Sequence, residues 1–212
     1  HPEWSHTDLS SLRLLNTGSM VVADSLIRAF HERGVPVGQV YGSTETAPIA
    51  VVLRREDAMR KVGSTGKPAP HCEAKLVNGE IWVRGPSVMR GYWNDGSGID
   101  AEGWFHSGDL GRIDEEGFWW IVGRSKEVII SGGENVHPAE IENVLADCPA
   151  IAEAAVIGVP DEKWGEVACA VVVRKKDASL SQEQVLQLFE GRLARYKHPR
   201  RVVFVDELPK TA

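Results

Sequence analysis

The chain has 212 residues, of which 42% are apolar and 25% charged, a balance typical of a globular protein with one or two domains. Acidic residues outnumber basic ones by 30 to 24, and the formal net charge of −6 argues against a nucleic-acid partner. No apolar run approaches the roughly 18 residues of a membrane helix, so we expect no membrane span. The three cysteines form no Cys-x-x-Cys pair. We therefore expect no disulfide framework and a reducing, cytoplasmic setting.

The first stretch, residues 1–62, is predicted to be the end of a large α/β domain. Residues 12–15 and 37–41 have the composition of short strands, and the apolar spacing of residues 21–33 predicts a helix between them. A strand, a helix and a strand within about 30 residues form a βαβ unit and predict a parallel sheet. Ligands bind such sheets beyond the carboxyl ends of the strands. The two loops expected there are residues 16–19 and 42–46.

The second stretch, residues 63–123, is predicted to be a small β-rich subdomain resembling a barrel. Asn78-Gly79 lies between two strand-like runs, which is the strongest short signal for a hairpin. Residues 114–117 separate a second pair of strand-like runs, 111–113 and 118–122. Short strands at regular spacing favour a small barrel or a sandwich.

The third stretch, residues 124–212, is predicted to be a compact α+β domain. Pro138 suits the first turn of a helix, and Ser181 with Gln184 fits the capping box of another. Residues 154–159, 167–174 and 201–205 are expected to be strands. Two apolar stripes are expected on the helices, namely Ile141, Val144, Leu145 and Cys148 in the first, and Leu186, Phe189, Leu193 and Tyr196 in the second.

The first candidate site is residues 41–46, YGSTET, at the end of a predicted strand. The ring of Tyr41 could stack on a base, and Gly42 would let the backbone approach a ligand closely. The hydroxyl of Thr44 could donate to a phosphate oxygen, and the carboxylate of Glu45 could hold Mg²⁺. Taken alone, the segment fits a polar turn with a threonine cap equally well.

Two further segments could bind parts of a nucleotide or a slender ligand. Asp109, in the segment WFHSGDL, could accept hydrogen bonds from both hydroxyls of a ribose, although Gly-Asp is more common in tight turns. Arg124 could fork onto ribose or phosphate oxygens, and Gly132-Gly133 could form an open loop. The alternative for this last region is a strand, a glycine turn and a helix start, with Arg124 in a surface ion pair.

In this order the three segments resemble the adenylate-forming, AMP-dependent synthetase and ligase superfamily, and more specifically its acyl-CoA synthetase branch. The resemblance covers nearly the whole chain and extends to residues 91–94, 160–166 and 196–211. It implies activation of a carboxylic acid by ATP and Mg²⁺ to an acyl-adenylate, followed by transfer to the thiol of coenzyme A. It also implies that the C-terminal domain is mobile and moves between the two half-reactions.

The resemblance also implies a role for individual residues. Gly18, Ser19 and Met20 would line the adenine, Tyr41 would stack on it with Gly42 beside it, and Ile121 would pack nearby. Thr44 would contact the α-phosphate, and Glu45 would bind Mg²⁺. Asp109 and Arg124 would hold the ribose, and Lys126 would be the hinge residue. Gly132 and Gly133 would border the pantetheine tunnel of CoA, with Trp164 in a segment nearby.

The resemblance leaves two elements of the superfamily outside this chain. The glycine-rich phosphate loop would lie before His1, and the catalytic lysine would lie after Ala212. Lys210 matches the lysine before the threonine of the terminal motif, not the catalytic one. We therefore expect this chain alone to be inactive. Two other hypotheses are a ligase that loads a carrier protein instead of CoA, and a non-catalytic nucleotide-binding fragment that self-associates into a homo-oligomer.

Overall fold

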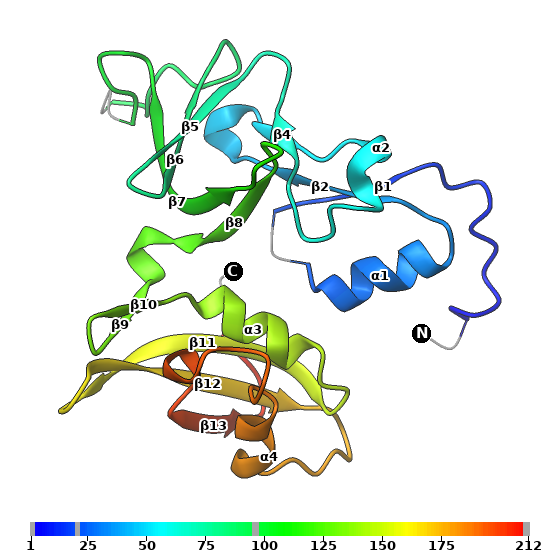
Figure 1. The fold of residues 1–212 in the computed structure, drawn as a ribbon, viewed down its shortest axis with the longest axis vertical. Coiled ribbons are helices and arrows are strands. Elements are labelled where there is room, and N and C mark those ends of the chain that lie inside the picture. The colour runs from blue at the N-terminus through cyan, green and yellow to red at the C-terminus, as the bar shows by residue number, and fades with distance from the viewer. Residues whose placement is uncertain (1–2, 20–21, 95–97, 210–212) are drawn as a thin grey trace. The chain divides into compact units, whose positions relative to one another are not determined.

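The computed structural model describes residues 3–19, 22–94 and 98–209, drawn as a ribbon in Figure 1. The chain divides into two compact units, His1–Ile121 and Val122–Ala212. The first unit therefore contains both of the stretches that the sequence analysis separates at residue 62. The division of the chain into three domains stays a prediction. In the described ranges, no helix is long and apolar enough to cross a membrane.

A four-stranded sheet of order β1-β2-β3-β4 opens the first unit. Its strands are β1 (Leu15–Thr17), β2 (Val37–Tyr41), β3 (Val51–Val52) and β4 (Lys67–Pro68), and its helices are α1 (Asp24–Glu32), the 3₁₀ turn η1 (Thr44–Thr46) and α2 (Arg55–Ala58). β1 and β2 pair in parallel, and α1 lies between them in the chain. This confirms the predicted βαβ unit. Ile27 anchors α1 and is 1% exposed.

The position of the first strand differs from the prediction of residues 12–15. Leu12 is exposed, whereas Leu15, Asn16 and Thr17 pair with Val37, Gly38 and Gln39. The prediction followed the apolar run, but the pairing with β2 sets the register of the strand. Asn16 and Thr17 are therefore strand residues, and only Gly18 and Ser19 of the expected loop lie beyond the strand end.

A second four-stranded sheet has the order β5-β6-β7-β8, and its last strand continues past Ile121 into the second unit. Its strands are β5 (Glu73–Val77), β6 (Glu80–Arg84), β7 (Phe105–Ile113) and β8 (Trp119–Arg124). Asn78 and Gly79 have φ of 51° and 83°, so the predicted hairpin forms with both turn residues at positive φ. The described strands form an open sheet and not the expected barrel. Its apolar residues share a core with β3, made of Ala50, Val51, Ile81, Val83 and Trp119.

The second unit contains a five-stranded sheet in which four strands have the order β10-β9-β12-β11 and β13 pairs in parallel with β12. Its strands are β9 (Ile129–Ser131), β10 (Glu134–Val136), β11 (Ile151–Asp161), β12 (Gly165–Arg174) and β13 (Arg201–Val205), and its helices are η2 (Ser125–Glu127), α3 (Pro138–Ala146), α4 (Gln182–Gln187) and η3 (Arg195–Lys197). The start of α3 at Pro138 and the capping box of Ser181 with Gln184 are both confirmed.

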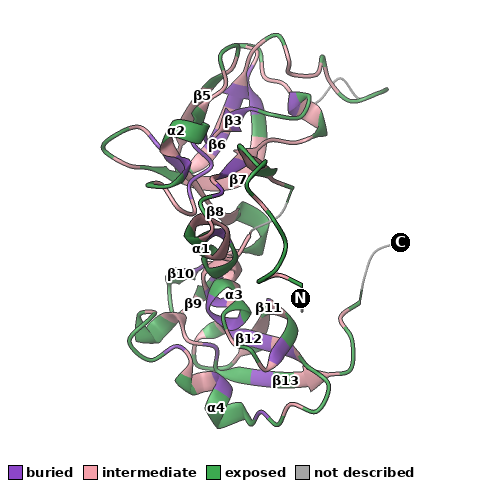
Figure 2. Ribbon diagram, turned by 90° about the vertical axis from the view of Figure 1, so that its right-hand side faces the viewer, coloured by how far each residue is buried: buried purple, intermediate pink, exposed green. Residues whose placement is uncertain are grey.

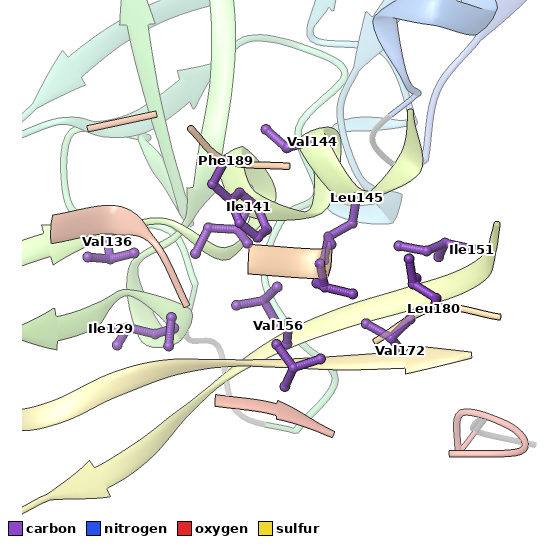
Figure 3. Packing of buried hydrophobic residues seen from close by; sticks show 14 residues of the cluster. Ile129, Val136, Ile141, Val144, Leu145, Ile151, Val156, Val172, Leu180 and Phe189 are labelled. Atoms are coloured by element: carbon purple, nitrogen blue, oxygen red, sulfur yellow. The ribbon is translucent and has the colours of Figure 1, made fainter. Parts of the chain in front are cut away.

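The core of the second unit lies where α3 and Phe189 meet the sheet (Figure 3). Ile141, Leu145 and Phe189 are fully buried, and the buried residues of β12 and α3 appear in purple in Figure 2. The stripe predicted for the second helix is wrong at its end. α4 ends at Gln187, and Tyr196 lies in η3 with 46% of its surface exposed. The chain turns after Phe189, so helical spacing no longer applies there.

Candidate functional site

The first unit brings together Tyr41 and Asp109, which are 68 residues apart in the sequence. Tyr41 is the last residue of β2, and Asp109 lies within β7. The Tyr41 hydroxyl donates a hydrogen bond of 2.8 Å to Oδ2 of Asp109. Tyr41 and Ile121 are both half-buried and pack against the same apolar cluster. Three of the predicted adenosine-binding residues therefore belong to one small region of the structure.

The loop after β2 is tightly folded on itself. Thr46 is 1% exposed, its hydroxyl donates to the carbonyl oxygens of Ser43 and Pro48, and it accepts from the Ser43 amide. A Cβ on Gly42 would lie 1.7 Å from the Pro48 carbonyl oxygen. Gly42 is therefore required by the approach of the chain to itself, whatever it does for a ligand. This folding leaves Thr44 exposed and Glu45 half-buried.

Glu45 is held by two contacts from the segment after β6. Its carbonyl oxygen accepts from the Met89 amide at 2.8 Å, and its Oε1 accepts from the Tyr92 hydroxyl at 2.9 Å. This hydrogen bond to the Glu45 carboxylate raises the pKa of Tyr92 above its ordinary value, with smaller contributions from burial and charge. The sequence analysis gave Tyr92 no role. Its only signal was its place in the matching segment 91–94.

The residues present fit a magnesium ion shared with a nucleotide better than a protein-only metal site. Within the described part of the chain, no three His, Cys, Asp or Glu side chains are grouped to hold a metal. Mg²⁺ is commonly bound by one or two carboxylates together with substrate phosphates. Glu45 offers one such carboxylate, next to the exposed hydroxyl-bearing Thr44.

The loop after β1 packs against the strand that carries Tyr41. A Cβ on Gly18 would lie 2.6 Å from a methyl carbon of Val40, so a larger residue would push this loop away from β2. Ser19 has φ of 70°, a left-handed conformation. Met20, the third predicted residue of this loop, lies outside the described residues.

In the second unit the structure brings the predicted glycine loop and Trp164 together. Gly132 and Gly133 have φ of 61° and 88° and form the turn between β9 and β10. The Gly132 amide donates to the Trp164 carbonyl oxygen at 2.9 Å, and a Cβ on Gly132 would lie 2.6 Å from the indole ring. The guanidinium of Arg200 lies 4.7 Å from the centre of that ring. The loop thus has an aromatic and cationic border.

Arg124 and Lys126 lie near the start of the second unit. Arg124 is the last residue of β8 and is exposed, and Lys126 is exposed within η2. Asp109 belongs to the first unit and Arg124 to the second. The predicted pairing of these two residues on a ribose therefore stays a prediction, as does the hinge role of Lys126.

Comparison with known proteins identifies the family of this chain. The AMP-binding enzyme family matches residues 1–93, and the C-terminal domain of AMP-binding enzymes matches residues 140–212. The chain belongs to the AMP-binding enzyme family. It is 54% identical to an indoleacetate–CoA ligase of Aromatoleum aromaticum, over all of this chain and 44% of that protein. It is 43% identical to a feruloyl-CoA synthase of an Amycolatopsis species, over all of this chain and 46% of that protein.

A solved structure shows the same fold as this chain. The o-succinylbenzoate CoA synthetase of Bacillus subtilis, in complex with its acyl-adenylate intermediate, matches 99% of this chain and 46% of its own with a TM-score of 0.91 and 40% identity. The same enzyme has been solved with ATP and a magnesium ion. The chain thus spans less than half the length of the CoA ligases that it resembles.

Proposed function

We propose that this chain is part of an AMP-forming CoA ligase that activates a carboxylic acid with ATP and passes the acyl group to CoA. The contact that carries the proposal is the hydrogen bond of Tyr41 to Asp109, because it sets an aromatic face and a carboxylate side by side near the end of β2. An aromatic ring can stack on adenine, and a carboxylate can accept from ribose hydroxyls. The relatives are CoA ligases, which supports the same conclusion.

In the first half-reaction the acid's carboxylate oxygen would attack the α-phosphorus of ATP and release pyrophosphate. In this reaction the Thr44 hydroxyl would donate a hydrogen bond to the α-phosphate. Glu45, whose carboxylate accepts a hydrogen bond from Tyr92, would bind the magnesium ion. When bound, Mg²⁺ would neutralise the negative charge of the phosphates as the pyrophosphate leaves. Gly18, Ser19 and Met20 would line the adenine, and Asp109 and Arg124 would hold the ribose.

In the second half-reaction the CoA thiol would attack the acyl carbon and release AMP. Gly133, where nothing lies within 4 Å of an added Cβ, would leave room for the pantetheine arm, and Gly132 would border it with Trp164 packed against it. The second unit would move about Lys126 between the two half-reactions.

The proposed substrate class is an aromatic carboxylic acid. The matched relatives are named for indoleacetate, ferulate and 2-succinylbenzoate, each of which carries an aromatic ring. This narrows the unspecified carboxylic acid that the resemblance implies to one class.

The test is ATP–pyrophosphate exchange by a protein that carries this chain at the length of its relatives. Indoleacetate, ferulate, 2-succinylbenzoate and a saturated fatty acid would be compared, and aromatic acids should give the faster exchange. Exchange with none of the acids would reject the ligase proposal, and exchange with the fatty acid alone would reject the aromatic class.

The acceptor is tested in the same protein by offering CoA and a phosphopantetheinyl carrier protein together. Acyl-CoA should be the product, and loading of the carrier alone would favour the carrier-protein ligase instead. We also propose that the 212-residue chain by itself forms no acyl-CoA. Thioester formation by the isolated chain would contradict this.

A further inference from the structure

A bulge in β7 surrounds Asp109. Trp82 of β6 lies opposite His106, and Glu80 lies opposite Leu110. Between these two pairs β6 has only Ile81, whereas β7 has Ser107, Gly108 and Asp109. The extra residues must leave the regular ladder, and such bulges bend a strand and re-aim its side chains. Gly108, at the centre, has φ of 71°, a conformation that favours glycine.

Two side chains make hydrogen bonds to three of the backbone groups at this bulge. The carboxylate of Glu80 accepts from the Gly108 amide at 2.8 Å. The hydroxyl of Ser107 accepts from the Asp109 amide at 3.0 Å and donates to the Ile81 carbonyl oxygen at 2.6 Å. Beyond the bulge, the Gly111 amide donates to Gly79, and the ladder resumes. The bulge is thus fixed from both sides by hydrogen bonds.

We propose that Glu80 and Ser107 are positioning residues that hold the β7 bulge and thereby aim the Asp109 carboxylate at the nucleotide. The inference rests on the proposed function, because Asp109 must bind the ribose for its position to matter. These hydrogen bonds hold the amides of Gly108 and Asp109, so they set the direction of the Cα–Cβ bond of Asp109. The Tyr41 hydroxyl then meets Oδ2 of Asp109.

The substitutions that keep or remove the hydrogen bonds differ between the two positioning residues. Glu80 is half-buried and acts as an acceptor, so Glu80→Gln keeps an oxygen for the Gly108 amide, whereas Glu80→Ala does not. Ser107→Ala removes both hydrogen bonds of the hydroxyl. Glu73→Ala is the matched control. Glu73 is a carboxylate on the same sheet that pairs with Arg84, and its side chain is 62% exposed.

The first measurement is amide hydrogen exchange in the 212-residue chain, which needs no catalysis. Glu80→Ala should speed exchange at Gly108, and Ser107→Ala should speed exchange at Asp109, each by about tenfold, the effect of losing one hydrogen bond. Glu80→Gln and Glu73→Ala should leave both amides protected. Unchanged exchange in Glu80→Ala and Ser107→Ala would overturn the proposal.

The second measurement is steady-state kinetics of these variants in a protein at the length of the relatives. Glu80→Ala and Ser107→Ala should raise KM for ATP by about tenfold and leave KM for CoA unchanged, with recovery in Glu80→Gln. A general loss of folding would not give this split. If Glu80→Ala does not fold, Ser107→Ala carries the same test. Faster amide exchange with an unchanged KM for ATP would overturn the positioning role.

Asp109→Ala separates failure of this inference from failure of the proposed function. It should raise KM for ATP at least as much as Glu80→Ala does. If Asp109→Ala leaves KM for ATP unchanged, the ribose role of Asp109 is wrong and the positioning role falls with it. If Asp109→Ala impairs ATP binding and the Glu80 and Ser107 variants do not, only the positioning inference is wrong.

Discussion

Replacing Gly42 by alanine tests how the loop after β2 is built. The added Cβ would lie 1.7 Å from the Pro48 carbonyl oxygen and 2.8 Å from the Thr46 hydroxyl. A relaxed carbon–oxygen contact is about 3.3 Å, so the two backbone segments would have to separate by about 1.6 Å. Both segments are backbone and cannot rotate away as a side chain would. The displacement must therefore pass into the turn that carries Thr44 and Glu45.

The structural cost and the functional cost of Gly42→Ala can be estimated separately. Overpacking of this kind destabilises a protein by about 1–3 kcal/mol. At about 4 °C per kcal/mol for a unit of this size, Tm of the first unit should fall by about 4–12 °C. A misplacement of about 1 Å in a catalytic group costs about 100-fold in rate, so exchange of pyrophosphate should fall by at least that factor.

Gly34→Ala is the matched control for this loop. Gly34 has φ of 75°, and nothing lies within 4 Å of an added Cβ. Its alanine variant should lose about 1–2 kcal/mol of stability from backbone strain, with no displaced loop and no loss of exchange activity. Thermal unfolding of this chain and pyrophosphate exchange in the longer protein give the two readouts. A Gly42→Ala protein with wild-type Tm and full activity would refute the reasoning.

Three further predictions concern single side chains. Glu45→Gln should lower the pKa of Tyr92 toward its ordinary value, measured by spectrophotometric titration of the phenol, because a neutral amide replaces the carboxylate that accepts the hydrogen bond of the phenol. Glu142→Gln should stabilise the chain at neutral pH, since burial raises the pKa of this carboxyl although the Val156 amide opposes the shift. Phe189→Ala should destabilise the second unit by about 3–5 kcal/mol in denaturant unfolding, because Phe189 is fully buried.

The sign for Glu142 follows from proton binding. A carboxyl whose pKa is raised on folding keeps its proton in the folded state over a pH range where the unfolded chain has lost it. Stability therefore falls as pH rises from the unfolded value of 4.5 to the folded pKa, and unfolding curves of Glu142→Gln should lack this fall. Glu162→Gln, on the exposed turn after β11, should keep it. Equal pH dependence in wild type and Glu142→Gln would contradict the reasoning.

The other two predictions have their own controls. Tyr92→Phe should remove the phenol with the raised pKa from the titration, which identifies that phenol among the three tyrosines. A Tyr92 pKa that does not move in Glu45→Gln would show that the carboxylate is not its cause. Leu26→Ala, on the exposed face of α1, should cost far less than Phe189→Ala. Equal losses would mean that Phe189 is not part of a packed core.

Features that depend on neighbouring residues could be predicted from the sequence. The hairpin at Asn78-Gly79, the start of α3 at Pro138 and the cap at Ser181 all follow from local backbone chemistry, and all three form as expected. The strand 37–41 was also predicted with its observed bounds. These elements carry their own signals because the residues that favour them lie within a few positions of one another.

Features that depend on distant residues required the tertiary structure. The register of β1 is set by its pairing with β2, and the exposure of Tyr196 by the turn of the chain after Phe189. The motifs supplied Tyr41 and Asp109 as candidates, but only the meeting of two sheets shows that their side chains touch. Tyr92 beside Glu45 and Glu80 beside Gly108 carry no local signal, because each contact joins segments separated by 28 residues or more. The sequence thus determined the kinds of groups at this site, and the packing of the sheets decided which of them act together.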